Sequence, residues 1–454
     1  MEGLEGIEFS AEPEDLLAYG FDASGLAGGP ACVVWPRSAD EAARAVAYAR
    51  ETGMSIVPRG AGTGLTGGSV PGAGAMVMSF EKLARILSVD YENLNVLVEP
   101  GVINGRLQRE LARRGYFYPP DPASMDFCTI GGNVAENAGG PRALKYGVTR
   151  DYVMELEAVL PSGEIITTGV KTHKGVVGYD LTRLLVGSEG TLAIVTKIRL
   201  KVLPMPEAVV TLLASFPDVE TAGRAVSDTI AAKVIPRTLE FMDRESISAV
   251  ENYRPTGLPS GAEALLLIEL DGAPQAIEAE AGRVVDICRG LGAEVEMAAD
   301  EEARQRLWQA RRALSPALYH LKPTKINEDV VVPRSRLADM LGGLRRLSGE
   351  TGIKIVNFGH AGDGNIHVNV MVDKGDDEEY RRGAALVREI FAMVLGLGGT
   401  ISGEHGVGLT KAPYIGMEIK DTELSLMKGI KRLFDPQGIL NPGKIWTPED
   451  AQVR

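Results

Sequence analysis

The stretch of sequence that decides the fold is Pro58–Gly68, which reads PRGAGTGLTGG. Glycine lets a backbone pass close to a ligand and adopt positive φ, so the N–H groups of such a loop can converge on an anion. The loop contains the dinucleotide spacing G-x-G-x-x-G and follows a short strand predicted to begin at Ser55. A Rossmann interpretation also needs a helix that opens at the last glycines. Here the chain continues Ser69-Val-Pro-Gly-Ala-Gly, which cannot begin a regular helix, so the spacing alone does not indicate an NAD site.

Two further glycine-rich elements follow in the sequence. The second is Thr129–Gly140 (TIGGNVAENAGG), which is preceded by the proline-rich stretch Tyr118–Ser124. The third is Val186–Thr191 (VGSEGT), which leads directly into a strand predicted over Leu192–Thr196. One such loop is an ordinary flexible connection in many proteins, but three in this order require another explanation.

The length and composition are those of a globular protein with more than one domain. A chain of 454 residues is too long for one ordinary core, so we expect two or three domains. The contents of 44% hydrophobic and 24% charged residues exclude a disordered chain. The net charge of −13, from 61 acidic and 48 basic residues, argues against a nucleic-acid partner. A few local cations can still bind an anionic substrate inside a cleft.

The sequence favours a cytoplasmic protein. Its first residues, MEGLEGIEFSAEPEDLL, are acidic and lack the apolar run of a signal or transit peptide. No stretch reaches the roughly 20 uninterrupted apolar residues of a transmembrane helix. Cys32, Cys128 and Cys288 lie too far apart in the sequence to predict an iron–sulfur cluster or a disulfide framework. A reducing compartment is therefore expected.

Hydrophobic periodicity divides the chain into three zones. Short strands and glycine-rich turns run to about Pro206, where the prolines of VLPMP mark a boundary. An alternation of strands and helices follows and predicts an α+β domain with helices packed on one sheet. The last zone, Asp421–Trp446, is a helix followed by a run rich in turn residues. The predicted strands are 95–99, 155–160, 193–202, 208–216, 238–241, 264–270 and 294–297, and the predicted helices include 39–52, 274–291 and one from Val219.

Taken together, the three glycine-rich elements resemble the FAD-binding domain of the vanillyl-alcohol-oxidase (PCMH-type) flavoproteins. The resemblance includes Val98–Val102 (VEPGV), Lys145–Gly147 (KYG) and Asn441–Lys444 (NPGK). The subgroup it is most similar to contains D-lactate dehydrogenase, D-2-hydroxyglutarate dehydrogenase and the catalytic subunit of glycolate oxidase. It implies an α+β protein with a two-subdomain FAD-binding domain over residues 1–205. A mixed α+β substrate domain with an antiparallel sheet and a metal site would span 206–420, and a helical segment, 421–454, would return to the flavin.

The same resemblance implies which residues bind FAD. Relatives that attach FAD covalently use a His or Cys near the first loop, and residues 55–75 contain neither, so non-covalent binding is expected. The implied cofactor-binding residues are Pro58, Arg59, Gly60, Ala61, Gly62, Thr63, Gly67, Gly68, Pro122, Thr129, Gly131, Gly132, Ala135, Gly139, Gly140, Tyr146, Glu189, Gly190, Ile194, Asn441 and Lys444.

Two of the five histidines are predicted to face each other in a hairpin. In the stretch GHAGDGNIH, Asp363-Gly364 is a strong signal for a two-residue turn. Such a turn pairs His360 directly with His367, with Cβ atoms about 4.5–5.5 Å apart on one face. Two imidazoles so placed can share one divalent ion, and Asn369 points the same way as a candidate for contacting substrate.

The stretch SGEHGVG supplies a third ligand and a base. Glu404 offers a carboxylate and His405 an imidazole outside the ligand set. Two histidines and one carboxylate suit zinc, manganese or iron with positions open to substrate. The alternative is that the paired histidines only pack or hydrogen-bond, but the resemblance implies that these residues are metal ligands and a catalytic histidine. His173 and His320 are isolated, and each is interpreted as a surface or core histidine.

A 2-hydroxy acid needs a fixed cation for its carboxylate, and a guanidinium suits this best. Arg311 and Ser315 are four residues apart on a helix that Pro316 ends or kinks, so they share a face. In the relatives, the resemblance implies, an Arg, a Thr and a Lys of this region hold carboxylates. The matching residues in this chain are Arg311, Ser315 and Lys325. The alternative for Arg311 is a solvated helix face.

The function expected from these parts is metal-assisted oxidation of a small D-2-hydroxy acid to the 2-oxo acid. The metal would lower the hydroxyl pKa, His405 would take the proton, and hydride would pass to FAD. D-lactate is favoured because Ser315 is smaller than the relatives' Thr and no second carboxylate clamp is evident. The alternatives are a glycolate oxidase catalytic subunit and a D-2-hydroxyglutarate dehydrogenase.

The expected partners are an electron acceptor and, for the assembly, a second copy in a homodimer. With no cluster motif and no NAD site, an electron-transfer flavoprotein, an iron–sulfur subunit or a quinone would take the electrons. Two other functions use part of the same pattern. A non-haem iron oxygenase would leave the glycine loops unexplained, and a non-catalytic electron-transfer subunit would leave Glu404 and His405 without a role.

Overall fold

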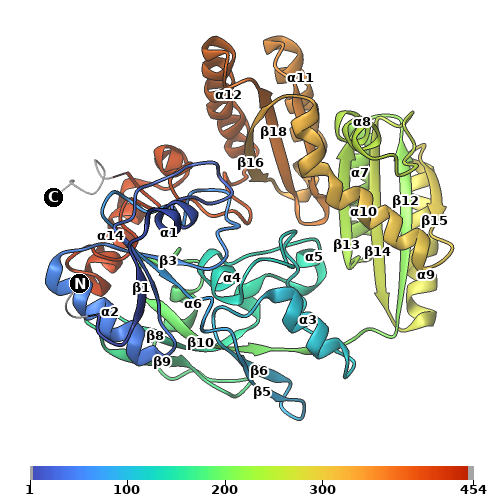
Figure 1. Ribbon diagram of the computed structural model, residues 1–454. Helices are drawn as coiled ribbons and strands as arrows, with labels where there is room; N and C mark the ends of the chain where they lie inside the picture. The colour runs from blue at the N-terminus through green and yellow to red at the C-terminus, as the bar shows by residue number, and fades with distance from the viewer. Residues whose placement is uncertain (1–3, 448–454) are drawn as a thin grey trace. The chain divides into compact units, whose positions relative to one another are not determined.

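The computed structural model describes residues 4–447, which form two compact units (Figure 1). The first unit contains the described residues up to Gly139, residues 147–205 and the described residues from Glu404 onward. The second contains residues 140–146 and 206–403. The break between residues 205 and 206 falls at the prolines of VLPMP, and the return to the first unit begins at Glu404, whereas residue 421 was expected. Residues 1–3 and 448–454, which the expected domains include, lie outside the described residues.

Two principal sheets form the first unit. One has the order β1-β2-β4-β3, in which β2, β4 and β3 are parallel and β1 is antiparallel. The other has the order β5-β6-β10-β8-β9 and is antiparallel throughout. The first glycine loop therefore connects two adjacent parallel strands, β3 and β4, without an intervening helix. This agrees with the sequence-based rejection of a Rossmann helix.

Helix α2 shows why this unit folds as the sequence predicts. The Ser38 side chain accepts a hydrogen bond from the Glu41 amide and caps the first turn, while Gly53, in the left-handed conformation, ends the last. Its buried residues, Ala42, Ala45, Val46 and Ala49, recur at helical spacing. They pack into a core with residues of β2, β3 and β4, so the apolar stripe fixes the helix against the four-stranded sheet.

The first unit contains these described strands and α-helices: β1 Glu8–Ser10, α1 Pro13–Ala18, β2 Cys32–Trp35, α2 Ala39–Thr52, β3 Ile56–Arg59, β4 Met76–Ser79, β5 Ile86–Asp90, β6 Asn95–Val98, α3 Asn104–Ala112, β7 Tyr116–Phe117, α4 Ile130–Glu136, β8 Val153–Val159, β9 Ile165–Gly169, α6 Leu181–Leu185, β10 Ile194–Lys201, β11 Leu203–Pro204, α13 Ile415–Glu418 and α14 Asp421–Phe434. Strands β11 and β7 form a separate two-stranded sheet. Among the described residues, no helix is both long and apolar enough to cross a membrane.

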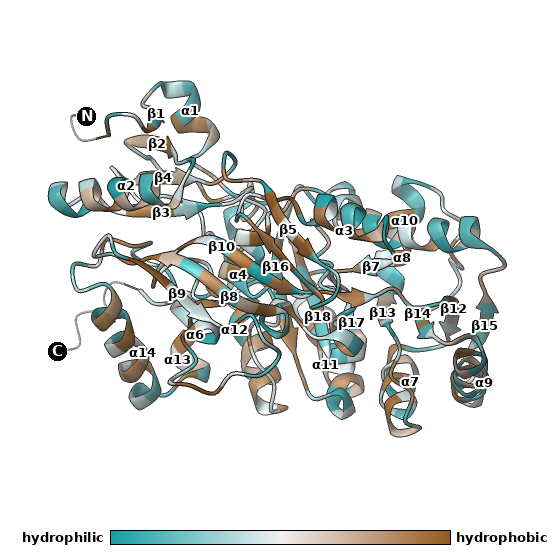
Figure 2. Cartoon of the chain, turned by 90° about the horizontal axis from the view of Figure 1, so that it is seen from below, coloured by the Kyte–Doolittle hydropathy of each residue, from teal (hydrophilic) through white to brown (hydrophobic). Residues whose placement is uncertain are grey.

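The second unit is built on one seven-stranded antiparallel sheet of order β15-β12-β14-β13-β17-β18-β16. Helices α8 and α10 lie on one face, and α7, α9 and α11 lie on the other (Figure 2). Helix α12 packs on β16 and β18. The prediction of helices packed on one sheet is therefore confirmed.

The sheet face under α8 and α10 is apolar at one end and polar at the other. Met242, Leu267 and Phe358 belong to a core that includes Leu314 of α10. Side chains alternate along a strand, so Glu240 lies on the same face as Met242, and Glu269 on the same face as Leu267. The functional residues of this unit lie at the polar end.

The second unit contains these strands and α-helices: α5 Ala143–Tyr146, β12 Ala208–Phe216, α7 Val219–Ala231, β13 Thr238–Asp243, α8 Arg244–Tyr253, β14 Ala264–Gly272, α9 Pro274–Gly290, β15 Glu294–Met297, α10 Glu301–Ala317, β16 Thr324–Val331, α11 Leu337–Thr351, β17 Ile355–His360, β18 Asn365–Val372 and α12 Asp377–Gly396.

Candidate functional site

A groove in the first unit is lined by residues of all three glycine-rich elements. The space within the groove is about 1390 Å³ when open solvent is counted. The predicted cofactor-binding residues that line it are Pro58, Arg59, Gly60, Ala61, Gly62, Thr63, Gly68, Pro122, Thr129, Gly131, Gly132, Ala135, Gly139, Glu189, Gly190 and Ile194.

The first loop is shaped by Gly62 and Arg59. Gly62 has φ +66°, and a Cβ atom there would lie 2.3 Å from a terminal nitrogen of Arg59. That guanidinium is held in place because it donates to the carbonyl of Phe21 at 2.6 Å and lies over the Tyr19 ring, 5.6 Å from its centroid. A side chain at position 62 would therefore have to displace an anchored cation.

Five predicted cofactor-binding residues do not line the groove: Gly67, Gly140, Tyr146, Asn441 and Lys444. Asn441 donates from its amide to the carbonyls of Gly68 and Glu189, at 2.9 and 2.7 Å. Lys444 donates to the carbonyl of Val70 at 2.8 Å. These two residues hold the glycine loops through hydrogen bonds, and their contact with the flavin stays a prediction.

Tyr146 also has a different neighbour from the one expected. Its hydroxyl donates to the Asp271 carboxylate at 2.8 Å, within the second unit. Lys145 donates to the Asp271 carbonyl at 2.5 Å. The KYG motif thus anchors the short segment 140–146 to β14. The flavin contact of Tyr146 stays a prediction.

The stretch SGEHGVG brings Glu404 and His405 to the groove. The Thr66 hydroxyl donates to the His405 carbonyl at 3.0 Å. The carboxylate of Glu189 accepts from the amides of Val407 and Gly408, each at 2.8 Å. Because these bonds hold the backbone, the imidazole of His405 is presented to the groove by a loop that is fixed on both sides.

A third carboxyl in the groove, that of Glu136, was not predicted. Burial raises its pKa well above the ordinary value, and the nearby Glu189 raises it further. The signal in the sequence was a Glu within the glycine motif TIGGNVAENAGG, where an apolar or hydroxyl side chain would be easier to bury.

In the second unit, β17 and β18 form the predicted hairpin with a different register. Phe358 pairs with His367, and His360 pairs with Asn365. The turn is a 3-10 helix over Ala361–Asp363 closed by Gly364 at φ +87°. The prediction that the two histidines are directly opposed is wrong by two residues. An even shift preserves the face, however, and the buried imidazoles have centroids 5.1 Å apart.

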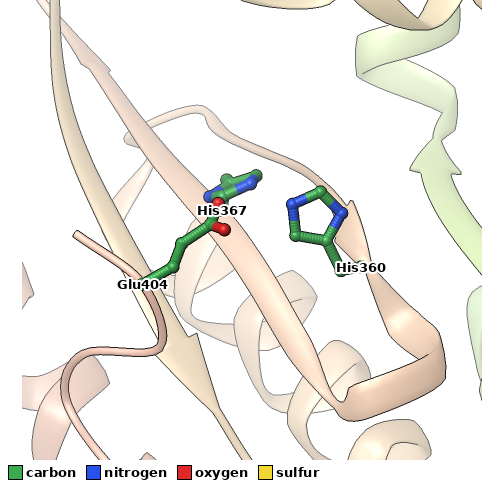
Figure 3. Close-up of side chains that lie close together, drawn as sticks. All are labelled: His360, His367 and Glu404. Carbon is green, nitrogen blue, oxygen red and sulfur yellow. The ribbon is translucent and has the colours of Figure 1, made fainter. Parts of the chain in front are cut away.

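Glu404 completes the predicted ligand set. One ligand atom from each of His360, His367 and Glu404 lies within 4.8 Å of the other two (Figure 3). The preceding residue, Gly403, donates from its amide to the backbone carbonyl of Asp329 in β16 at 3.0 Å. A Cβ on Gly403 would lie 2.5 Å from the Asn365 amide nitrogen, so only glycine permits this close approach. Two imidazoles and a carboxylate at these separations fit a divalent transition metal.

Arg311 is not on a solvated helix face. It is buried, and its Nε and a terminal nitrogen lie 2.7 Å from the carboxylate of Glu240. The second oxygen of that carboxylate lies 2.7 Å from Nδ1 of His360. Burial alone would raise the pKa of Glu240, but His360 and Arg311 more than offset it and the pKa lies below its ordinary value. Glu240 was not predicted from the sequence, although a Glu inside the buried strand TLEFMD was a signal.

Ser315 and Lys325 are brought together. The Lys325 ammonium donates to the Ser315 hydroxyl at 2.6 Å, and burial lowers its pKa to about 8. Asn369 is fully buried, donates to the carbonyls of Val356 and His367, and accepts from Asn327. These bonds occupy the amide within the sheet, so we no longer assign Asn369 a contact with substrate.

The two remaining histidines stand apart from these clusters. The ring of His320 packs on Tyr253 with centroids 4.9 Å apart, and His173 is exposed. Cys32, Cys128 and Cys288 are buried and free.

Comparisons with known proteins identify the family. The family model of the FAD-linked oxidase C-terminal domain matches residues 205–445, and that of an FAD-binding domain matches residues 30–169. The chain belongs to the FAD-linked oxidases. This confirms the resemblance stated from the glycine-rich elements. As an FAD-linked oxidoreductase, the protein has in the groove of its first unit a glycine-lined site suited to that cofactor.

Several characterised relatives span nearly the whole chain. The glycolate oxidase subunit GlcD of Bacillus subtilis is 47% identical over 96% of this chain and 93% of its own length. The D-lactate dehydrogenase of Anaerostipes hadrus is 37% identical over 92% of this chain and 89% of its own. Substrate-bound p-cresol methylhydroxylase covers 97% of this chain and 94% of its own, with a TM-score of 0.80 at 18% identity. That likeness concerns the fold alone, and it confirms the predicted PCMH-type α+β architecture.

The Gly62→Ala substitution should weaken FAD binding in this family member. The left-handed conformation costs a non-glycine residue about 1–2 kcal/mol, and the added Cβ displaces Arg59 as well. We expect at least a tenfold rise in the dissociation constant of FAD, measured by titrating the deflavinated protein. Gly72→Ala is the control, because a Cβ at Gly72 meets nothing within 4 Å. Equal FAD affinity in both variants would contradict the role assigned to the loop.

Proposed function

We propose that this protein oxidises a small 2-hydroxy acid to the 2-oxo acid, with glycolate as the first candidate. The observation that carries the proposal is that Glu404 and His405 lie in the same groove as the glycine-rich elements. The 47% identity to a glycolate oxidase subunit supports glycolate better than the D-lactate first expected. Ser315 does not discriminate between the two acids, because the difference between Ser and Thr is one methyl group and both substrates are small.

Each group of side chains has a role in this proposal. His405 accepts the hydroxyl proton as general base, since an imidazole titrates near neutral pH. Arg311 and Lys325 fix the substrate carboxylate, and His360, His367 and Glu404 hold a divalent cation. When bound, FAD supplies the hydride acceptor and the cation polarises the hydroxyl.

The charges of the second unit favour a monocarboxylate. Three cations near the polar end of its sheet are already paired with carboxylates: Arg304 with Glu269, Lys145 with Asp271, and the buried Arg311 with Glu240. Lys325 makes its contacts with Ser315 and the Tyr319 ring instead. Arg311 and Lys325 together would serve one substrate carboxylate, which supports glycolate or lactate over hydroxyglutarate.

Lys325 should give kcat/KM a dependence on pH. With a pKa of about 8, the ammonium is mostly charged at pH 7 and mostly neutral at pH 9. Its attraction for a carboxylate is therefore present below pH 8 and lost as the pH rises, so kcat/KM should fall by about tenfold between pH 7 and 9. Lys325→Met should lower kcat/KM at pH 7 and flatten this limb. Lys322→Met is the control, because Lys322 is paired with Glu379.

Anaerobic reduction of the bound flavin tests the proposed function. The purified protein is mixed with glycolate, D-lactate, L-lactate and D-2-hydroxyglutarate, and the loss of flavin absorbance is followed. Glycolate should bleach the flavin with the highest kcat/KM. A higher value with D-lactate would reassign the substrate, and no bleaching with any acid would favour a non-catalytic electron-transfer role.

We also propose that the chain works as one subunit of a larger assembly. Its relatives in Bacillus subtilis and Escherichia coli carry the name of a glycolate oxidase subunit. The electrons would leave through an iron–sulfur subunit, an electron-transfer flavoprotein or a quinone. A homodimer is the alternative assembly, and the mass of the complex purified from the native host distinguishes the two.

A further inference from the structure

One carboxylate in the second unit touches two functional side chains at once. Glu240 of β13 is completely buried. One of its oxygens lies 2.7 Å from Nδ1 of His360, and the other accepts from Arg311 at 2.7 Å. The first neighbour is a proposed metal ligand and the second a proposed substrate-binding cation.

The contact with His360 fixes the role of each imidazole nitrogen. An ionised carboxylate has only acceptor atoms, so Nδ1 must carry the hydrogen in this pair. The lone pair of the neutral ring is then on Nε2, and a lone pair is what a metal ion binds. A carboxylate behind a metal-binding histidine fixes its tautomer and orientation and raises the basicity of the ligand.

Arg311 is connected to His360 by a second route, through a series of ring contacts. The Arg311 guanidinium lies over the Phe358 ring, 5.1 Å from its centroid. The Phe358 ring lies 5.6 Å from that of His367, which in turn lies 5.1 Å from that of His360. Glu240 closes this series by bonding to both of its ends. The orientation of the guanidinium and that of the imidazole are therefore set by one group.

We propose that Glu240 is a positioning residue that aims Nε2 of His360 at the metal and holds Arg311 for the substrate carboxylate. This inference rests on the metal centre of the proposed function. A buried ion pair is a poor source of stability, since an apolar replacement of similar volume is often as stable or more so. We therefore attribute the burial of Glu240 to its orienting of His360 and Arg311 and not to a gain in stability.

The neighbouring strand offers a matched control. Glu269 of β14 is equally buried on the same face of the sheet. It accepts from Thr211, Arg304 and the Trp308 indole, but from none of the proposed metal ligands. Glu240→Gln and Glu269→Gln therefore each remove one buried negative charge from the same face of the sheet. Only Glu240→Gln removes a carboxylate that contacts a proposed metal ligand.

The experiment measures zinc affinity of the FAD-loaded protein by competition with a chromophoric chelator. Glu240→Gln should bind Zn²⁺ 10–100-fold more weakly than the unmodified protein, the usual effect of losing such a partner. Glu269→Gln should stay within twofold. The KM for glycolate should also rise in Glu240→Gln, because the neutral amide no longer holds the Arg311 guanidinium in position through an ion pair.

The outcomes separate this inference from the function on which it rests. Unchanged zinc affinity in Glu240→Gln, or an equal loss in Glu269→Gln, overturns the positioning role. No zinc binding by the unmodified protein overturns the metal centre and this inference together. Zinc binding without oxidation of any acid contradicts the proposed function and leaves the positioning role of Glu240 in place. If Glu240→Gln does not fold, the double variant Glu240→Gln/Arg311→Met, which leaves no unpaired arginine, should fold and still show the zinc loss.

Discussion

The His405→Ala variant is expected to lose nearly all turnover of 2-hydroxy acids while retaining FAD. A general base contributes about 10²–10⁴-fold to the rate, so flavin reduction should slow by that factor. The cofactor should remain because the loop around residue 405 is held through its backbone, by Thr66 and Glu189. The measurement is the rate of anaerobic flavin bleaching by glycolate, together with the ratio of flavin to protein absorbance.

The control for this variant is His320→Ala. The ring of His320 packs on Tyr253, and His320 is not among the residues that line the groove, so its loss should leave the bleaching rate within a few-fold. Comparable rates in His405→Ala and the unmodified protein would show that another group takes the proton. Loss of FAD from His405→Ala would instead assign this residue to cofactor binding.

Local sequence signals predicted the elements of the fold well. Helix α2 and strands β12 and β15 have the predicted bounds, because a capped amphipathic stripe or a short apolar run between turns contains its own limits. The three glycine-rich elements were recognised as one site before their contacts were known. Each glycine is conspicuous in the sequence, and together they line one groove.

The register of the β17–β18 hairpin could not be predicted from local sequence signals. An Asp-Gly pair forms a two-residue turn only if both residues adopt positive φ. Gly364 does so, whereas Asp363 continues the 3-10 turn begun at Ala361. The loop is therefore longer by two residues. The face shared by His360 and His367 was predicted correctly because strand periodicity is insensitive to an even shift.

Contacts between distant residues could not be predicted from the sequence. Glu240 and Arg311 are 71 residues apart and meet only because α10 crosses the face of the sheet that β13 presents. Asn441 binds the backbone of the loops around the groove, a contact that its motif did not indicate. A motif indicates that a residue belongs to a site, but whether the side chain faces the ligand or supports the loop depends on tertiary packing.

Removal of divalent metal is expected to abolish acid oxidation and leave the flavin in place. Polarisation of a substrate oxygen by a metal is worth several kcal/mol, so a loss of about 3 kcal/mol, or roughly a hundredfold in kcat/KM, is the least expected. The protein is dialysed against a chelator, and activity and FAD content are measured before and after Zn²⁺ or Mn²⁺ is restored. Whichever metal restores activity identifies a competent ion.

Substitution of a single proposed metal ligand also tests whether oxidation needs the metal, and it requires no chelator. His367→Ala removes one of the two buried imidazoles, and added metal should not restore its activity. His173→Ala, at an exposed histidine, controls for loss of an imidazole elsewhere. Full activity after chelation, or in His367→Ala, would mean that the two histidines and Glu404 hold no catalytic metal. The hydrogen bond from His360 to Glu240 would then serve only to pack the sheet, and proton removal by His405 would have to proceed without help from a cation.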